Sequence, residues 1–145
     1  MDYLELIKNF RDIMSLNQRI NKDIAKKHNL LLIDINILSF LHYNPTLDTA
    51  SDIVEYRGLA KGNVSSSLSK LKKEGMVDIF QDPLDKRLKR IRLNAKADAV
   101  LEDIESGLKE ISSIITSGID ADSIDRINKL LPLLGNNAKD YLEER

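Results

Sequence analysis

The spacing of hydrophobic residues predicts helices in the first third of the chain. Leu4, Ile7 and Phe10 begin a loose stripe of helical period that runs from about residue 3 to residue 27. A second, denser apolar segment covers residues 30–43, and it should turn Ile35, Leu38 and either Leu41 or His42 inward. The pair Asn44-Pro45 is a stop signal, because proline cannot continue a helix.

A short helix, a glycine turn and a second helix follow. Thr49 and Asp52 have the spacing of a capping box, which predicts a helix over residues 50–57. Gly58 then allows a sharp turn. In residues 61–74, Val64, Leu68 and Leu71 share one face, and Gly75 suits the left-handed residue that ends a helix. This order of elements is typical of a helix-turn-helix.

Two short stretches of period two come next, and they predict a β-hairpin. Val77 and Ile79 alternate with polar or exposed positions, as do Ile91 and Leu93. Residues 81–89 lie between the two strands. They hold Asp82-Pro83 as a turn signal and a basic tip, Lys86-Arg87. The fold class expected is therefore mainly α, a winged helix-turn-helix with a two-stranded wing.

The polar face of the helix that follows Gly58 carries small residues, hydrogen-bonding groups and cations, with no acid among Gly62, Asn63, Ser66, Ser69, Lys70 and Lys73. Such a helix fits the major groove of DNA, and a basic hairpin can reach an adjacent groove. Asp85 is two residues before Arg87, so in an extended segment it could hold the arginine for insertion into the minor groove. The residues expected to contact DNA are Lys61, Asn63, Ser65, Ser66, Lys70, Lys86, Arg87, Lys89 and Arg90.

Two further helices are predicted after the hairpin. Asn94 can cap a helix over residues 95–116, whose apolar residues follow a coiled-coil seam from Ala97 to Ile115. A last helix should run from Ser123 to about residue 144, with a kink or break at Pro132. So long a seam exceeds what a small winged-helix module can cover, which favours a homodimer over an intrachain bundle. The residues expected at the dimer interface are Leu4, Ile7, Leu108, Ile111, Ile115, Ile127 and Leu130.

These elements suggest two regions: residues 1–29 with 95–145 as a helical dimerisation region, and residues 30–94 as the DNA-binding region. The distribution of charge supports this division. From Arg57 to Arg92 there are ten Lys or Arg and four Asp or Glu, a net charge of +6, whereas the whole chain has −1. A local basic patch of this kind is typical of nucleic-acid binding.

Composition excludes several other classes of protein. The absence of cysteine rules out disulfides, cysteine-ligated zinc and thiol sensing. His28 and His42 lack the spacing of metal ligands, so both are interpreted as ordinary surface or helix-end residues. Without an apolar run of membrane-spanning length or a signal peptide, a cytoplasmic protein is expected, with no membrane partner and no cofactor.

The chain resembles the MarR-type transcriptional regulators in the order of its elements over nearly its whole length. The likeness is clearest in residues 58–65, in residues 71–77 and in the wing, where Asp82, Asp85, Lys86 and Arg87 fit the family's Asp-x-x-Asp-Arg/Lys-Arg pattern. Asn94 and Ala97 stand where the family usually has Thr and Gly, and Pro83-Leu84 replaces a frequent cation, which implies one phosphate contact fewer.

This resemblance implies a homodimeric regulator, more often a repressor, that binds a pseudo-palindromic operator in double-stranded DNA. It also implies release from DNA by a small-molecule effector, often phenolic in the family, held between the DNA-binding and dimerisation lobes. The alternative from a different class is a winged-helix module that binds a protein and no longer binds DNA. An enzyme is not expected, because no nucleophile with a base at usable spacing and no phosphate-binding glycine loop is present.

Overall fold

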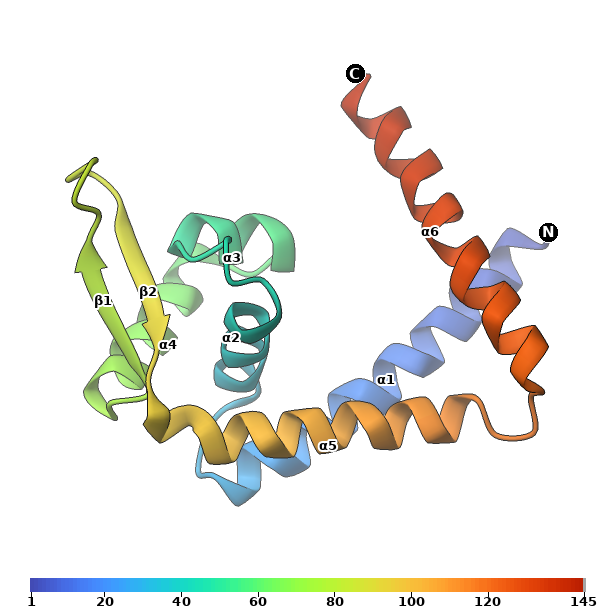
Figure 1. Cartoon of the computed structure of the whole chain (residues 1–145), viewed down its shortest axis with the longest axis horizontal. Coiled ribbons are helices and arrows are strands. Elements are labelled where there is room, and N and C mark those ends of the chain that lie inside the picture. The colour runs from blue at the N-terminus through green and yellow to red at the C-terminus, as the bar shows by residue number, and fades with distance from the viewer. Residues whose placement is uncertain (145) are drawn as a thin grey trace. The chain divides into compact units, whose positions relative to one another are not determined.

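The computed structural model describes residues 1–144, which form mostly helices and one hairpin (Figure 1). In chain order the elements are α1 (Tyr3–Lys27), α2 (Leu32–Tyr43), α3 (Ala50–Arg57), α4 (Lys61–Lys73), β1 (Val77–Gln81), β2 (Lys89–Leu93), a 3-10 turn η1 (Ala95–Ala97), α5 (Asp98–Ile115) and α6 (Ala121–Glu143). The predicted class, a mainly helical winged helix-turn-helix with a two-stranded wing, is confirmed.

The chain divides into two compact units, Met1–Ile111 and the segment from Ser112 onward. The first unit contains the helix-turn-helix and the hairpin, with α2 packed against both α1 and α4. In the second unit, α6 begins at the cap residue Asp120, whose carboxylate accepts a hydrogen bond from the backbone N–H of Ser123. The candidate DNA-binding elements therefore all belong to the first unit.

The hairpin pairs its strands in the register that the apolar alternation requires. β1 and β2 are antiparallel, and Ile79 lies opposite Ile91 while Val77 lies opposite Leu93. Val77 and Ile91 are buried, whereas Phe80 and Arg92 are on the outer side, where the Arg92 guanidinium lies 5.4 Å from the centre of the Phe80 ring. One face of the wing thus closes over the core and the other faces solvent.

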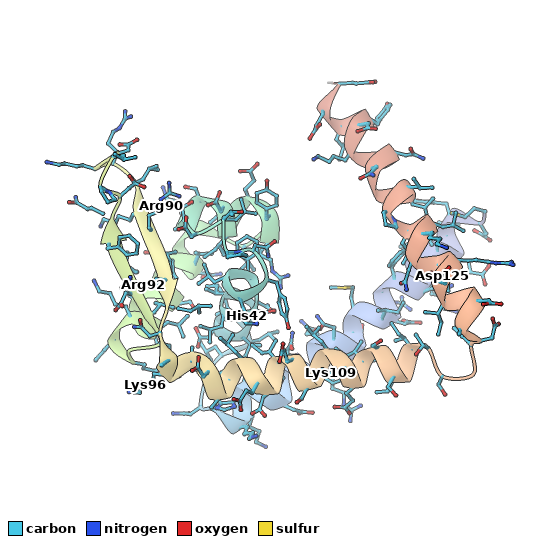
Figure 2. The ribbon with its side chains drawn as sticks, in the orientation of Figure 1. His42, Arg90, Arg92, Lys96, Lys109 and Asp125 are labelled. Atoms are coloured by element: carbon cyan, nitrogen blue, oxygen red, sulfur yellow. The ribbon has the colours of Figure 1, made fainter. Side chains whose placement is uncertain are left out.

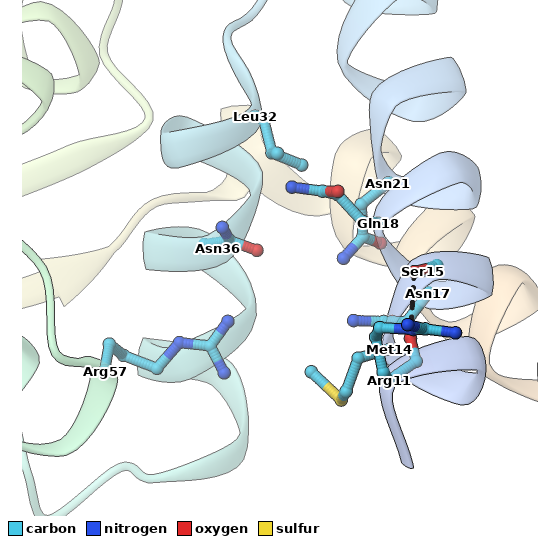
Figure 3. A pocket seen from close by; sticks show the side chains of 9 residues that line it. All are labelled: Arg11, Met14, Ser15, Asn17, Gln18, Asn21, Leu32, Asn36 and Arg57. Atoms are coloured by element: carbon cyan, nitrogen blue, oxygen red, sulfur yellow. Dashed lines mark hydrogen bonds between the residues drawn. The ribbon is translucent and has the colours of Figure 1, made fainter. Parts of the chain in front are cut away.

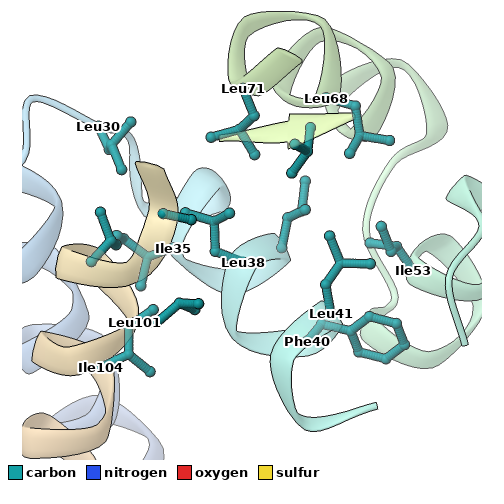
Figure 4. Packing of buried hydrophobic residues seen from close by; sticks show 14 of the residues in the cluster. Leu30, Ile35, Leu38, Phe40, Leu41, Ile53, Leu68, Leu71, Leu101 and Ile104 are labelled. Atoms are coloured by element: carbon teal, nitrogen blue, oxygen red, sulfur yellow. The ribbon is translucent and has the colours of Figure 1, made fainter. Parts of the chain in front are cut away.

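The core of the first unit lies where α2 meets α4 and α5 (Figure 4). Ile35, Leu38 and Leu71 are each 0% exposed. Leu41 is buried and His42 is exposed, which resolves the inward position that the sequence left open. Because Val64, Leu68 and Leu71 are all buried, α4 turns its opposite face outward as predicted.

Local sequence signals set the bounds of the helix-turn-helix. The Thr49 hydroxyl accepts from the backbone N–H of Asp52, and the Asp52 carboxylate accepts from that of Thr49, so the predicted capping box is confirmed. Gly58 and Gly75 have φ of 61° and 77°, values that glycine adopts without a steric penalty. Each lies where its helix was predicted to end.

Two predictions about helix starts were wrong, as was one of the two alternatives at Pro132. The second helix begins at Leu32 and not at Leu30, because the Asp34 carboxylate accepts from the backbone N–H of Leu31 and fixes the start there. The Asn94 side chain donates to the Gly75 carbonyl at 3.2 Å and makes no cap bond, and η1 precedes α5. Pro132 lies inside the continuous helix α6, so the predicted alternative of a break is wrong, and the alternative of a kink stays a prediction.

Candidate nucleic-acid interface

The second helix of the helix-turn-helix, α4, presents a polar face to solvent. Its apolar side packs on the core, and the side chains of Lys61, Asn63, Ser65 and Ser66 are all exposed. Within residues 1–144, Lys61 has no ion-pair partner within 4.0 Å. Four of the five residues predicted on this helix therefore lie on one accessible surface, which we call the α4 face.

The turn of the wing is built by Asp82. Its Oδ1 accepts from the backbone N–H groups of Leu84 and Asp85, at 2.8 and 2.9 Å. An aspartate that satisfies the amides two and three residues ahead is a common way to close a turn. The basic residues that follow, Lys86 and Arg87, are thereby placed at the tip of the hairpin.

Asp85 holds Arg87, as the spacing predicted. The Arg87 Nε donates to Asp85 Oδ1 at 3.1 Å and a terminal nitrogen donates to Oδ2 at 3.3 Å. The Arg87 side chain is nevertheless 90% exposed. Its hydrogen bond is the main reason that the pKa of Asp85 lies below the usual carboxyl value. The pair orients a guanidinium that stays accessible to a partner.

Arg90 has a different environment from the other cations of the wing. It lies on β2 (Figure 2), donates to Asp82 at 2.9 Å and to Asp48 at 2.7 Å, and its side chain is 31% exposed. These bonds raise the pKa of Arg90, and the bond to Asp82 contributes most. In return, the bond from Arg90 is the largest cause of the lowered pKa of Asp82. Arg90 thus ties the wing to the loop before α3, where the backbone N–H of Ile91 also donates to the Asp48 carbonyl.

Lys70 is also engaged within the protein. Its ammonium lies 3.0 Å from Oδ2 of Asp34, a carboxylate that is 0% exposed. Sequence reasoning placed Lys70 and Arg90 among residues that meet DNA, but it missed Asp34, Asp48 and Asp82 as their partners. Asp34 is 36 residues from Lys70 in the sequence, and Asp48 and Asp82 are 42 and 8 residues from Arg90. Helical periodicity does not predict pairs between different elements.

Most residues predicted at a dimer interface are accessible in the single chain. Leu4 on α1 and Leu130 on α6 are 79% and 58% exposed, and Ile111 is the exception at 7%. Ile111 therefore belongs to the interior of its own chain. The other predicted residues are between 41% and 49% exposed: Ile7, Leu108, Ile115 and Ile127.

A cavity of about 280 Å³ lies between α1 and α2 (Figure 3). Arg11 and Arg57 reach it from opposite sides, and Asn36 and Gln18 add amide groups. Arg57 has no ion pair within the described residues, and Arg11 pairs only with its exposed neighbour Asp12. Seven of the nine lining residues are polar or cationic by type, and those not yet named are Met14, Ser15, Asn17, Asn21 and Leu32.

His28 has a partner that its sequence neighbourhood did not reveal. It caps α1, and its Nε2 lies 2.6 Å from Asp103 on α5, which also pairs with Lys27 at 2.8 Å. No group of three or more His, Asp or Glu in residues 1–144 could hold a metal ion. In the same residues, each helix is too short or too polar to cross a membrane.

Comparison with known proteins gives a consistent result. A MarR family model matches residues 28–88. The HTH-type transcriptional regulator TcaR of Staphylococcus aureus is 26% identical over 143 residues, which is 97% of this chain and 93% of TcaR. A MarR transcriptional regulator from Methanosarcina mazei superposes with a TM-score of 0.78 at 20% identity, covering 94% of this chain and 97% of the other. A mutant of S. aureus MepR bound to an oligodeoxyribonucleotide matches with a TM-score of 0.60 at 18% identity, covering 95% and 99%.

Proposed function

We propose that the chain is a MarR-type transcriptional regulator that acts as a homodimeric repressor of a pseudo-palindromic operator. In this proposal residues 61–74 enter the major groove and residues 81–89 enter the minor groove. The observation that carries it is the separation of charge at the interface. The acids of the wing are occupied by Arg87 and Arg90, while Lys61, Lys86 and Lys89 have no acidic partner within residues 1–144. The structurally similar MepR mutant was solved with an oligodeoxyribonucleotide, which supports a DNA partner.

The α4 face would provide the base contacts. Asn63, Ser65 and Ser66 are short, exposed hydrogen-bonding side chains on a helix narrow enough for the major groove. Serine does not raise helix stability, because it competes for backbone hydrogen bonds. Contacts with bases or phosphates would explain the exposed Ser65 and Ser66 better. Lys61, at the first turn, would meet a phosphate or a base edge.

The tip of the wing would enter the minor groove. A guanidinium fits the narrow, negatively charged channel of an A·T-rich segment, and Arg87 is both exposed and oriented by Asp85. Lys86 and Lys89 flank it and would contact phosphates, which position the protein without specifying sequence. Arg90 would act within the protein by holding the wing against Asp48.

A homodimer would cover the apolar residues that a single chain leaves exposed. We propose that residues 1–29 and 95–145 make the dimerisation region and residues 30–94 the DNA-binding region. Leu4 and Leu130 support this, because large apolar side chains at such exposure usually mark an interaction surface when they gather on a helix face. Such a dimer would place two copies of α4 on one operator.

We also propose that a small polar anion binds between α1 and α2 and releases the operator. The support is the pair of arginines that lines this cavity, since guanidinium groups bind carboxylates and phosphates with directed hydrogen bonds. A screen of small carboxylates by thermal shift, repeated with Arg57→Gln, tests the assignment. A ligand that stabilises the parent and not the variant, and that lowers DNA affinity, is the expected result.

Selection of bound sequences from random duplex DNA tests the main proposal. The purified protein should enrich a pseudo-palindrome whose two halves are related by the symmetry of the dimer. A protein that enriches no sequence, and that instead captures another protein through the wing, would favour the alternative of a winged-helix interaction module.

A further inference from the structure

Asp34 on α2 is a fully buried acid whose side-chain partners both lie on α4. It lies in the first turn of α2 and its side chain is 0% exposed. Oδ2 accepts from the backbone N–H of Leu31 at 2.8 Å and from the Lys70 ammonium at 3.0 Å, and Oδ1 accepts from the Ser67 hydroxyl. A buried carboxylate is costly unless it is paired and hydrogen-bonded, so this site is tolerated only while all three donors are in place.

These bonds restrain α4 in a way that its apolar contacts do not. Ser67 and Lys70 are three residues apart, which puts both on one stripe of the helix facing α2. Apolar packing is non-directional and tolerates small rotations of a helix. Hydrogen bonds to the two oxygens of one fixed carboxylate are directional, so they do not tolerate such a rotation. Asn63 and Ser66, the α4 residues proposed to contact bases, are four residues and one residue from Ser67. Because they belong to the same helix, a restraint on the rotation of α4 at Ser67 also fixes the direction of their side chains.

The Lys70 charge is used inside the protein. Its side chain is 34% exposed, and its ammonium is bound to an acid that has no contact with solvent. Moving Lys70 to a phosphate would leave the Asp34 carboxylate buried without its countercharge, which is strongly unfavourable. Lys61, at the start of the same helix, has no acidic partner among the described residues.

We propose that Asp34, Ser67 and Lys70 form a clamp that sets the rotation of α4 and thereby its sequence specificity, and that Lys70 makes no phosphate contact. This inference rests on the proposed binding of DNA by α4. It makes Asp34 a positioning residue: it acts through α4 and touches no DNA itself. Ser67 is likewise removed from the surface, being 4% exposed.

The test measures two quantities for each variant of the full-length protein. The first is the specificity ratio, the Kd for a scrambled duplex divided by the Kd for the selected operator at one salt concentration. The second is the slope of log affinity against log salt. The variants are Asp34→Asn, Ser67→Ala and Lys70→Met, with two controls on the same helix, the exposed Ser69→Ala and Lys61→Met.

The clamp variants should lower the specificity ratio about tenfold, the loss expected for a misplaced base contact, with the salt slope unchanged. Ser69→Ala should change neither quantity, and Lys61→Met should flatten the slope by about 1.8 for the two protomers. Should Asp34→Asn fail to fold, Ser67→Ala decides, because it removes one hydrogen bond and keeps the charge pair.

Two results would overturn the inference. In the first, the clamp variants lose resistance to urea but keep the parent's specificity ratio when fully folded, which is a purely structural role. In the second, Lys70→Met flattens the salt slope as much as Lys61→Met does, which makes Lys70 a phosphate contact. A parent protein that does not distinguish the two duplexes would overturn the proposed function itself, and this inference with it.

Discussion

The salt dependence of DNA binding can be calculated from the ion pairs in the structure. Of the six cations that the sequence placed at the interface, Lys70 and Arg90 are bound to internal acids. Lys61, Lys86 and Lys89 have no such partner within residues 1–144, and Arg87 pairs only at the surface. That leaves four cations per protomer, or eight per dimer. If each of the eight neutralises one phosphate charge, with Arg87 doing so from the minor groove, the contribution is about −0.9 each and the slope of log affinity against log salt should be about −7.

If all six cations of each protomer contacted phosphates, the dimer would make twelve contacts and the slope would be about −11. Between about 50 and 200 mM salt, a slope near −7 lowers affinity by roughly 10⁴, and a slope near −11 by roughly 10⁶. Fluorescence anisotropy with a labelled operator over this range separates the two values. A slope near −11 would show that the Asp34 and Asp48 pairs open on DNA and would refute the reasoning from internal pairing. A slope near zero would refute phosphate contact altogether.

Three further perturbations have expected outcomes. Leu130→Glu should lower the mass in sedimentation from about twice 16.5 kDa toward 16.5 kDa, because it puts an unpaired carboxylate into an apolar interface, whereas Leu84→Glu, at a 98% exposed wing position, should leave the mass unchanged. Gly107→Ala brings a Cβ within 2.9 Å of Ile20 Cγ2 and should cost about 1–3 kcal/mol relative to Gly62→Ala, which meets nothing within 4 Å; equal urea midpoints would contradict this packing. Lys27 and then His28 lower the pKa of Asp103 below 3.8, so this acid contributes stability above that pH and loses it as pH falls further; Asp103→Asn should flatten the acid limb of stability against pH, and an unchanged acid limb would exclude this source.

Local patterns in the sequence predicted the elements of the winged helix well. The capping box at Thr49, the left-handed glycines at 58 and 75 and the alternation of Val77 and Ile79 each depend on residues close together in the chain. The Asp85–Arg87 contact was also predicted, but from an extended segment. The structure instead has a turn there, in which the backbone N–H of Leu88 donates to the Asp85 carbonyl, so the contact was right and its stated reason was not.

The internal ion pairs could not be predicted in that way. Periodicity identifies the buried face of a helix, but it does not say which side chain of another element lies opposite. Asp34 looked like an ordinary polar residue near a helix start, and only the packing of α2 on α4 shows that it is fully buried against Lys70. The contact between His28 and Asp103 spans 75 residues and was missed for the same reason.

Chemical interference on the selected operator can show whether α4 enters the major groove and the tip of the wing enters the minor groove. Methylation of guanine N7 marks the major groove, and methylation of adenine N3 marks the minor groove. We expect interference at N7 within each half-site and at N3 beside it. Arg87→Ala should lose the N3 interference alone, while helicity and the dimer persist. Interference at neither position, or an Arg87→Ala pattern identical to that of the parent, would contradict this placement.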